Sequence, residues 1–247
     1  MVPRRIILSP HPDDAVWSLG GAIPLWKNEG EVVILSVYDG DASAHATVRF
    51  RETQHRWRSF GSAAQRRVEE ARAMSYLQCH YRGLGYCDAA MRLSAAGQFE
   101  YASQQSVLGR RADEDWPAVP DSLAKELQSL LRPQDTLVAP LAVGLHPDHC
   151  TVHKLARQFI GKIVYYAEFP YYKPGEPWQL SSHLGSVGLT LEETTLPCDW
   201  EHWLTAALSY RSQIVRLFRT RANFSDHLAL YAQAAAGRGV CRIWSTR

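Results

Sequence analysis

Short runs of β-branched and apolar residues alternate with segments of helical pattern along most of this chain. Two such runs lie in 4–9 (RRIILS) and 31–41 (EVVILSVYDGD). Between them, residues 13–30, DDAVWSLGGAIPLWKNEG, are typical of one helix that ends at Asn28–Gly30. The pattern resumes in four further segments: a helix over 122–131, a strand in 135–143, a helix from Pro147 and a strand in 162–169. This alternation predicts the α/β fold class, with a mostly parallel sheet flanked by helices.

Other parts of the chain add to this alternation. We expect polar helices near Val48–Phe60 and Ser62–Gln78; in the second, charged and apolar residues fall on opposite helix faces. The segment Gly83–Pro120 shows no sustained period, so we predict a long functional loop there. In the C-terminal third, 185–197 predicts added antiparallel strands and Trp200–Phe218 predicts one long helix.

Composition narrows the class of partner. The chain has 247 residues, 46% of them hydrophobic, which is enough for a single domain spanning 1–247. A formal charge of +2 and the lack of a lysine–arginine block argue against nucleic acid or a membrane surface as a partner. No apolar stretch reaches the length of a membrane span, and residues 1–10 lack the pattern of a signal peptide. We therefore expect a cytoplasmic protein with a small-molecule partner.

The cysteines suggest neither a disulfide framework nor a metal site. They are five in number, scattered and without a CxxC pair, so neither disulfides nor a thiolate zinc site is expected. We expect buried or unreactive thiols.

Two histidine clusters each follow a predicted strand. The first is His11–Asp14 (HPDD) and the second is His146–His149 (HPDH). Because functional groups gather beyond the carboxyl ends of parallel strands, the two loops could face each other across one crevice. A catalytic zinc site uses three nitrogen or oxygen ligands, which His11, Asp14 and one histidine of the second cluster would supply. The alternative is that the acidic residues only cap helices and that Pro147 is a first-turn proline.

The segments PHPDDAVWSLGG and HPDHCTVH together resemble the paired signature of the PIG-L/LmbE-like zinc-dependent de-N-acetylases. Weaker similarity extends to about Gln213, in RRVEEARAMSYL, LGYCDAAMR, EFPYY and ALSYRSQ. The resemblance implies a Rossmann-like sheet, one Zn²⁺ ion per chain and hydrolysis of an acetamide on a sugar of the N-acetylglucosamine type.

The resemblance also implies a role for each residue of the two clusters. The implied metal ligands are His11, Asp14 and His149. Asp13 matches the general base, and Asp148 is placed to orient His146. His146 matches the histidine that stabilises the tetrahedral intermediate and that, if protonated, could then protonate the departing amine. The two adjacent carboxylates would thus have different roles, Asp14 as a metal ligand and Asp13 as the base, since neighbouring residues at a strand-to-helix turn project in different directions. The family commonly has glutamate where this chain has Ala15, a change that removes no ligand.

Substrate contacts are expected from polar residues outside the clusters. The family often uses an arginine of the helix that contains Arg66 and Arg67 to bind substrate hydroxyls. The alternative is that both arginines lie on a solvent-exposed, charged face of this helix. Asp88 and Arg92, in CDAAMR, are candidates of the same sort.

Further residues have both a functional and a structural interpretation. Five aromatic residues could stack on a sugar, although most aromatics are expected in the core: Trp57, Trp116, Tyr171, Tyr172 and Trp178. His153 lies one helical turn after His149, but a fourth ligand would close the metal site, so we expect it in the core or in an outer shell. Gly20–Gly21 lacks the full dinucleotide-binding pattern and is better explained by close backbone packing.

The expected function is therefore that of a zinc-dependent hydrolase that deacetylates an N-acetylglucosaminyl conjugate, a soluble glycoside intermediate of bacterial secondary-metabolite (antibiotic-like) biosynthesis. Two alternatives stay open: a metal-dependent hydrolase of another bond, and a non-catalytic sugar-binding protein of the same fold. The lack of acidic clusters for a two-metal site counts against phosphoester chemistry. The presence of Asp13 together with all three ligands counts against loss of catalysis.

Overall fold

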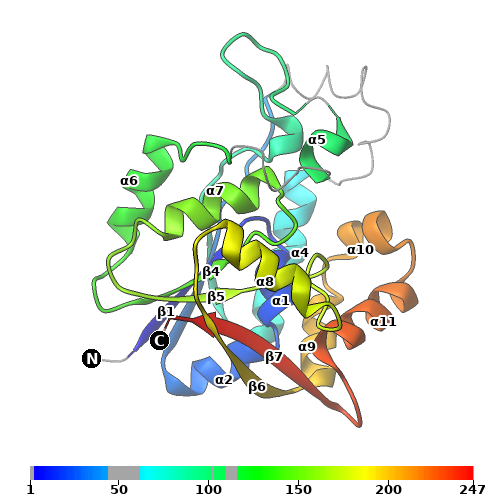
Figure 1. Ribbon diagram of the computed structural model, residues 1–247. Coiled ribbons are helices and arrows are strands. Elements are labelled where there is room, and N and C mark those ends of the chain that lie inside the picture. The colour runs from blue at the N-terminus through cyan, green and yellow to red at the C-terminus, as the bar shows by residue number, and fades with distance from the viewer. Residues whose placement is uncertain (1–2, 44–61, 102, 109–115, 247) are drawn as a thin grey trace.

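Seven strands form one sheet in the computed structural model, which describes residues 3–43, 62–101, 103–108 and 116–246 (Figure 1). Five neighbouring strands are parallel: β1 (Arg4–Ser9), β2 (Glu31–Ser36), β3 (His80–Gly83), β4 (Thr136–Pro140) and β5 (Lys162–Tyr166). The other two pair antiparallel: β6 (Glu192–Asp199) and β7 (Arg238–Ser245). The order across the sheet is β3-β2-β1-β4-β5-β7-β6. The expected α/β class, with antiparallel strands in the C-terminal third, is confirmed.

The strand order reverses between β1 and β4. The chain builds β2 and β3 on one side of β1 and then returns to place β4 on the other side, with Ile6 opposite Leu137. In open α/β sheets a crevice forms at such a switch point, outside the carboxyl ends of the strands. Since His11 follows β1 and His146 follows β4, the fold brings the two histidine clusters to this crevice.

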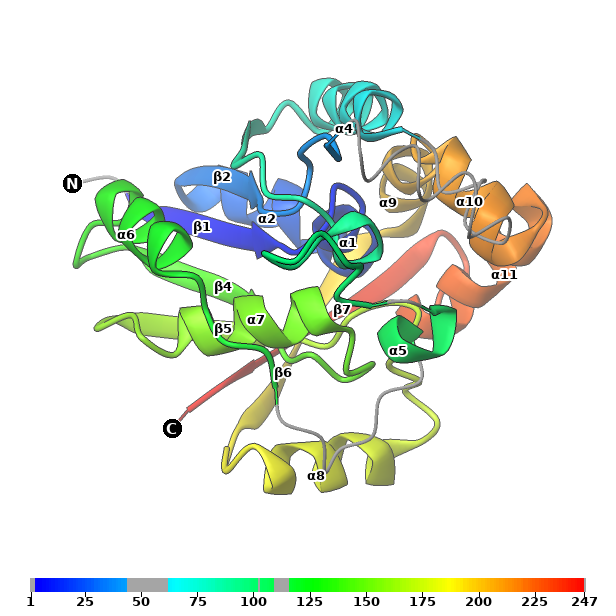
Figure 2. The same cartoon turned by 90° about the horizontal axis from the view of Figure 1, so that it is seen from above.

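Helices cover both faces of the sheet. In Figure 1, α6 (Asp121–Leu130) and α7 (Pro147–Ala156) lie above it, and α2 (Ala22–Glu29) lies below it. Figure 2 shows α1 (Asp14–Leu19) near the centre of the view from above, with α4 (Ala63–Leu77), α10 (Arg211–Phe218) and α5 (Gln104–Leu108) around it. The other helices in the described residues are η2 (Ala89–Met91), α8 (Pro177–Ser186), α9 (Trp200–Ala207) and α11 (Arg221–Ala232).

The segment 13–30 forms two helices rather than the single one predicted. The break is at Gly20–Gly21, where an added Cβ would lie 2.3 Å from the Trp203 ring and 2.4 Å from Cys198 Sγ. The Trp203 indole N–H also donates to the carbonyl of Val16 at 2.8 Å. Close packing against Trp203 thus ends α1, in agreement with the expected packing role of the two glycines.

The segment Trp200–Phe218 was also wrongly predicted as one helix. It divides into α9 and α10 around Ser209–Tyr210, and the break lets this turn bind α4. The Tyr210 hydroxyl donates to Glu70 at 2.5 Å, and the Ser212 backbone N–H and hydroxyl donate to Glu69 at 2.8 and 2.7 Å. The buried carboxylates of the RRVEEARAMSYL segment therefore attach α4 to α10.

Most aromatic side chains belong to the core, as expected. Trp17, at the centre of the cluster, packs against Phe169, Phe218 and Phe224 with ring centroids 5.1 to 5.9 Å apart. This cluster joins α1, α10 and α11 behind the switch-point crevice, so the loop after β1 rests on a rigid base.

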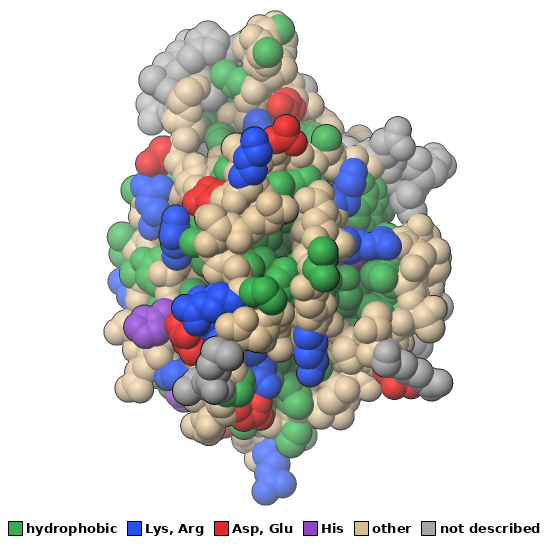
Figure 3. Space-filling model, turned by 90° about the vertical axis from the view of Figure 1, so that its left-hand side faces the viewer, with side chains coloured by type: hydrophobic (Ala, Val, Ile, Leu, Met, Phe, Trp, Pro, Cys, Tyr) green, Lys and Arg blue, Asp and Glu red, His purple; other side chains and the backbone are tan. Residues whose placement is uncertain are grey.

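The predicted helix near Val48–Phe60 lies outside the described residues. The face of the molecule in Figure 3 carries acidic and basic side chains side by side, without a block of one sign. Within the part of the chain that the structure describes, every helix is too short or too polar to cross a membrane.

Candidate active site

A hydrogen-bonded turn after β1 separates the directions of the two adjacent aspartates. The Asp14 carboxylate accepts the backbone N–H of His11 at 2.8 Å, and the Ser9 hydroxyl bridges the carbonyl of His11 and the N–H of Ala15. Asp13 occupies the N-cap position of α1 but makes no side-chain capping bond. Helix capping therefore does not explain Asp13.

Three side chains from the two clusters converge on one point. Asp14 Oδ2 lies 3.3 Å from His11 Nδ1 and 3.3 Å from His149 Nε2. The opposite ring nitrogens contact other carboxylates: His11 Nε2 lies 3.0 Å from Asp148 and His149 Nδ1 lies 2.9 Å from Glu168. Each ring therefore lies between two carboxylates. If a metal ion replaces the proton on an inner nitrogen, the outer nitrogen keeps its N–H and donates it to Asp148 or Glu168.

This arrangement fits a metal ion. Tetrahedral zinc with bonds of about 2.0 to 2.1 Å separates its ligand atoms by about 3.3 Å, which is the spacing found here. Metal-binding histidines almost always donate their other N–H to a carboxylate, carbonyl or water, as His11 and His149 are placed to do. Two overlapping groups of described residues also have possible ligand atoms within 4.8 Å of one another, and neither includes Asp14: His11, His146 and His149, and His11, Asp88, His146 and Asp148.

The charge of the site also favours a cation. Burial lowers the pKa of His11, but the nearby carboxylates of Asp88 and Asp14 outweigh it and raise that pKa to about 10. Burial likewise opposes charge on His149, yet Asp14 and Glu168 raise its pKa to about 9. The surrounding carboxylates therefore stabilise positive charge at the convergence point, whether a proton or a metal ion supplies it.

Asp13 lies beside this point and is held by Arg66. The Arg66 guanidinium donates to Asp13 Oδ1 at 3.0 Å and to Asp88 Oδ2 at 3.2 Å. Burial raises the pKa of Asp13 to about 6, although Arg66 opposes the shift. A carboxylate with a pKa near the working pH suits a general base. Arg67 points elsewhere: it donates to the Asp39 carbonyl at 2.7 Å and does not line the pocket.

His146 caps α7 and presents one nitrogen to the pocket. Its Nδ1 accepts the backbone N–H of Asp148 at 3.2 Å, and its ring packs edge-on against His11. Burial and the charge on His11 lower the pKa of His146 well below its usual value. A neutral His146 that accepts at Nδ1 carries its proton on Nε2, so it can donate one hydrogen bond into the pocket.

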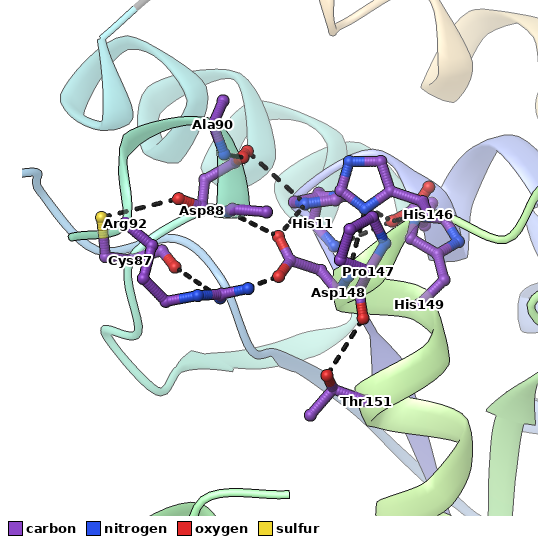
Figure 4. Close-up of polar contacts among 12 residues, drawn as sticks. His11, Cys87, Asp88, Ala90, Arg92, His146, Pro147, Asp148, His149 and Thr151 are labelled. Atoms are coloured by element: carbon purple, nitrogen blue, oxygen red, sulfur yellow. Dashed lines mark hydrogen bonds and ion pairs between the residues drawn. The ribbon is translucent and has the colours of Figure 1, made fainter. Parts of the chain in front are cut away.

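The Asp148 carboxylate is directed at His11 and Arg92 rather than at the ring of His146 (Figure 4). Its Oδ1 accepts from Arg92 at 2.9 Å, and its Oδ2 accepts from the Ala89 N–H at 2.9 Å as well as contacting His11. The contact with His146 is made by the backbone N–H of Asp148 alone. Arg92 thus supports Asp148 instead of lining the pocket, whereas Asp88 does line it.

Apolar side chains complete the pocket wall. Trp17, Phe169, Pro170 and Leu217 line it together with Tyr171, whose ring lies 5.5 Å from that of His149. The predicted loop Gly83–Pro120 contributes Asp88 and Val107. The remaining space is about 50 Å³, so the pocket as it stands holds only a small group.

Other aromatic candidates lie elsewhere. Tyr172 packs against Tyr231 and Trp244, and Trp116 packs against His153. Trp57 and the Trp178 side chain lie outside the described part of the chain.

His153 is a core residue, in agreement with the sequence-based preference. It is 1% exposed, and its Nδ1 contacts the Pro140 carbonyl at 2.9 Å.

Glu168 is a site residue that sequence reasoning did not identify. It is fully buried, accepts the Ala142 N–H at 2.7 Å and contacts His149. The available signal was an acidic residue inside the predicted apolar strand at 162–169, because a lone buried carboxylate needs a partner.

Comparison with known proteins gives one family and several relatives. The sequence model of the GlcNAc-PI de-N-acetylase (PIG-L) family matches residues 6–160. The chain is 30% identical over 176 residues to 2′-N-acetylparomamine deacetylase of Streptomyces fradiae; the match covers 68% of this chain and 57% of that relative's length.

Two solved structures share the fold. A zinc-inhibited form of teicoplanin deacetylase has a TM-score of 0.69 at 22% identity, covering 98% of this chain and 97% of that one. The pseudoaglycone deacetylase for the antimicrobial reagent A40926 has a TM-score of 0.68 at 21% identity, and the match covers 99% of this chain and 97% of that one.

Proposed function

The chain belongs to the PIG-L family of GlcNAc-PI de-N-acetylases, and from this premise we propose that it is a metal-dependent hydrolase that removes the acetyl group from an N-acetylglucosaminyl conjugate. The observation that carries the proposal is the grouping of Asp13 with His11, Asp14 and His149 at the switch point between β1 and β4. A base beside a three-ligand metal site is the arrangement that amide hydrolysis requires.

The substrate we propose is a soluble glycoside intermediate of bacterial secondary metabolism. Two similar proteins are a 2′-N-acetylparomamine deacetylase and a teicoplanin deacetylase. These names support an amino sugar attached to a larger, antibiotic-like group.

We propose that His11, Asp14 and His149 hold one zinc ion, with Asp148 and Glu168 orienting the two imidazoles. When bound, such an ion polarises the acetyl carbonyl and lowers the pKa of the attacking water. Asp13 takes the proton from that water on the oxygen that Arg66 does not bind. The Nε2–H of His146 donates to the oxyanion that develops on the carbonyl oxygen.

The second half of the reaction returns the proton. As the carbon–nitrogen bond breaks, protonated Asp13 delivers its proton to the departing nitrogen, so the products are a free amine and acetic acid, which ionises to acetate. Arg66 keeps the Asp13 carboxylate directed at the pocket in both steps. Asp148 acts on this chemistry through His11, since its carboxylate contacts that ring.

Acetate release tests the proposal directly. Purified protein loaded with zinc is expected to release acetate from N-acetylglucosaminides, and exhaustive chelation is expected to abolish the release until zinc is restored. Acetate release that is unaffected by chelation would contradict the metal assignment. No release from any N-acetylated amino sugar would contradict the proposed activity.

A further inference from the structure

A large groove adjoins the catalytic pocket. It lies between the segment 169–176 and α11 and encloses about 930 Å³, within the range of about 300 to 1,000 Å³ typical of ligand sites. Figures 1 and 2 both place the chain that leads into α8 beside α11. The groove and the catalytic pocket share Phe169 and Pro170 in their walls, so the two spaces are neighbours at this dipeptide.

The groove is apolar with a rim of mixed charge. Leu230, Ala229, Ala234 and Pro174 contribute apolar surface, and Leu230 is 73% exposed to solvent. Of the large exposed apolar side chains, Leu230 lines this groove, and a concave, mostly apolar surface is typical of ligand sites.

The groove carries few charges. Lys173 and Glu176 contact at 3.5 Å, and the Asp226 carboxylate lies on the opposite wall beside His227. One carboxylate outside the Lys173–Glu176 pair leaves the lining mostly apolar, which suits an uncharged group.

The same apolar character continues into the catalytic pocket. Leu217 of α10 lines that pocket and is 43% exposed, and Pro170 lies in the wall common to both spaces. With about 50 Å³ of space, the catalytic pocket is far smaller than a site for a whole conjugate. The rest of the substrate must extend out of it, and this groove is a neighbouring apolar space large enough to receive it.

We propose that the groove between residues 169–176 and α11 binds the aglycone of the conjugate, and that this aglycone is neutral and apolar. The inference rests on the proposed deacetylase function, because it assigns the catalytic pocket to the N-acetylated sugar. Leu230 is then a specificity-determining residue that contacts the aglycone and not the reacting atoms.

A homologous series of alkyl N-acetylglucosaminides, from methyl to decyl and in both anomers, tests the proposal. In the parent protein, the kcat/KM for acetate release is expected to rise with chain length. Leu230→Arg places a charge in the groove at a solvent-exposed position and is expected to lower the decyl-to-methyl ratio of kcat/KM by about tenfold, the effect of losing a good apolar contact. Ile160→Arg is the matched control, since Ile160 is 93% exposed and lines neither space; it should leave the ratio unchanged.

Calorimetric binding of the decyl glycoside to the same three proteins separates this inference from the proposed activity. Tight binding that Leu230→Arg weakens and Ile160→Arg does not supports the groove assignment, even if no acetate is released. An unchanged decyl-to-methyl ratio and unchanged decyl binding in Leu230→Arg overturn the assignment, as does deacetylation whose kcat/KM is independent of chain length.

Discussion

The exchange Asp13→Asn separates the two adjacent carboxylates of the first cluster. The asparagine carbonyl oxygen can still accept from Arg66, and Arg66 keeps its second partner, Asp88, at 3.2 Å. The amide nitrogen that replaces the other oxygen cannot take a proton from water at neutral pH. The variant is therefore expected to fold and to bind metal, because the convergence point of His11, Asp14 and His149 is untouched.

The expected loss of activity is large. General-base catalysis contributes about 100- to 10,000-fold, which corresponds to roughly 3 to 5.5 kcal/mol of barrier. The loss should appear in kcat, since Asp13 acts on the attacking water, with KM little changed. Asp14→Asn should behave differently: Asp14 Oδ2 contacts both inner ring nitrogens, so its metal affinity should fall by more than the roughly 100-fold typical of an outer-shell partner.

The assay pairs metal content with turnover. Each variant is loaded with zinc, its metal is measured by elemental analysis after gel filtration, and acetate release is followed under saturating substrate. The reasoning predicts metal without turnover for Asp13→Asn and loss of metal for Asp14→Asn. Near-parental kcat in metal-replete Asp13→Asn would refute it, and His146 would then be the first candidate for the base.

Three further predictions concern the carboxylate that contacts His149, the arginine that contacts Asp148, and the dependence of stability on pH. Glu168→Gln removes the charge behind His149 and should weaken zinc affinity about 10- to 100-fold, as competition with a chelator measures; unchanged affinity would argue against an orienting role. Arg92→Gln removes the partner of the Asp148 carboxylate and should also weaken zinc binding, whereas Arg67→Gln, outside the pocket, should not; equal affinities in both variants would contradict this. Burial raises the pKa of Glu70 to about 7, so the folded state retains a proton that the unfolded state releases above about pH 4.5. Unfolding free energy should fall with rising pH between those values, by on the order of 3 kcal/mol from this group, and denaturant titrations should show that Glu70→Gln removes that decrease.

Local sequence patterns were enough to predict four of the five parallel strands and to place the two histidine clusters after two of them. Apolar β-branched runs identified β1, β2, β4 and β5, and both histidine clusters stand directly after such runs. Because parallel strands all present their carboxyl ends at one edge, a pattern confined to short segments already predicts that the two clusters lie at the same edge.

The same local signals could not predict where helices break or which elements close the sheet. The breaks at Gly20–Gly21 and at Ser209–Tyr210 depend on Trp203 and on the Glu69–Glu70 pair, which lie far away along the chain. The strand β7 inserts between β5 and β6 although it is the last strand in the sequence, and neither it nor α11 was predicted.

The sequence by itself therefore determined the residue types of the site: the histidines, the adjacent carboxylates and their places after two strands. Only the tertiary structure decided which nitrogen of each histidine faces Asp14, because that choice depends on Asp148, 137 residues from His11, and on Glu168, 19 residues from His149. It likewise decided that Arg66 binds Asp13 and that Arg92 binds Asp148. The physical reason is that hydrogen-bond direction and burial are set by side chains that meet only when the sheet has formed. The periodicity of apolar residues, in contrast, carries information about the structure of one segment and not about its partners.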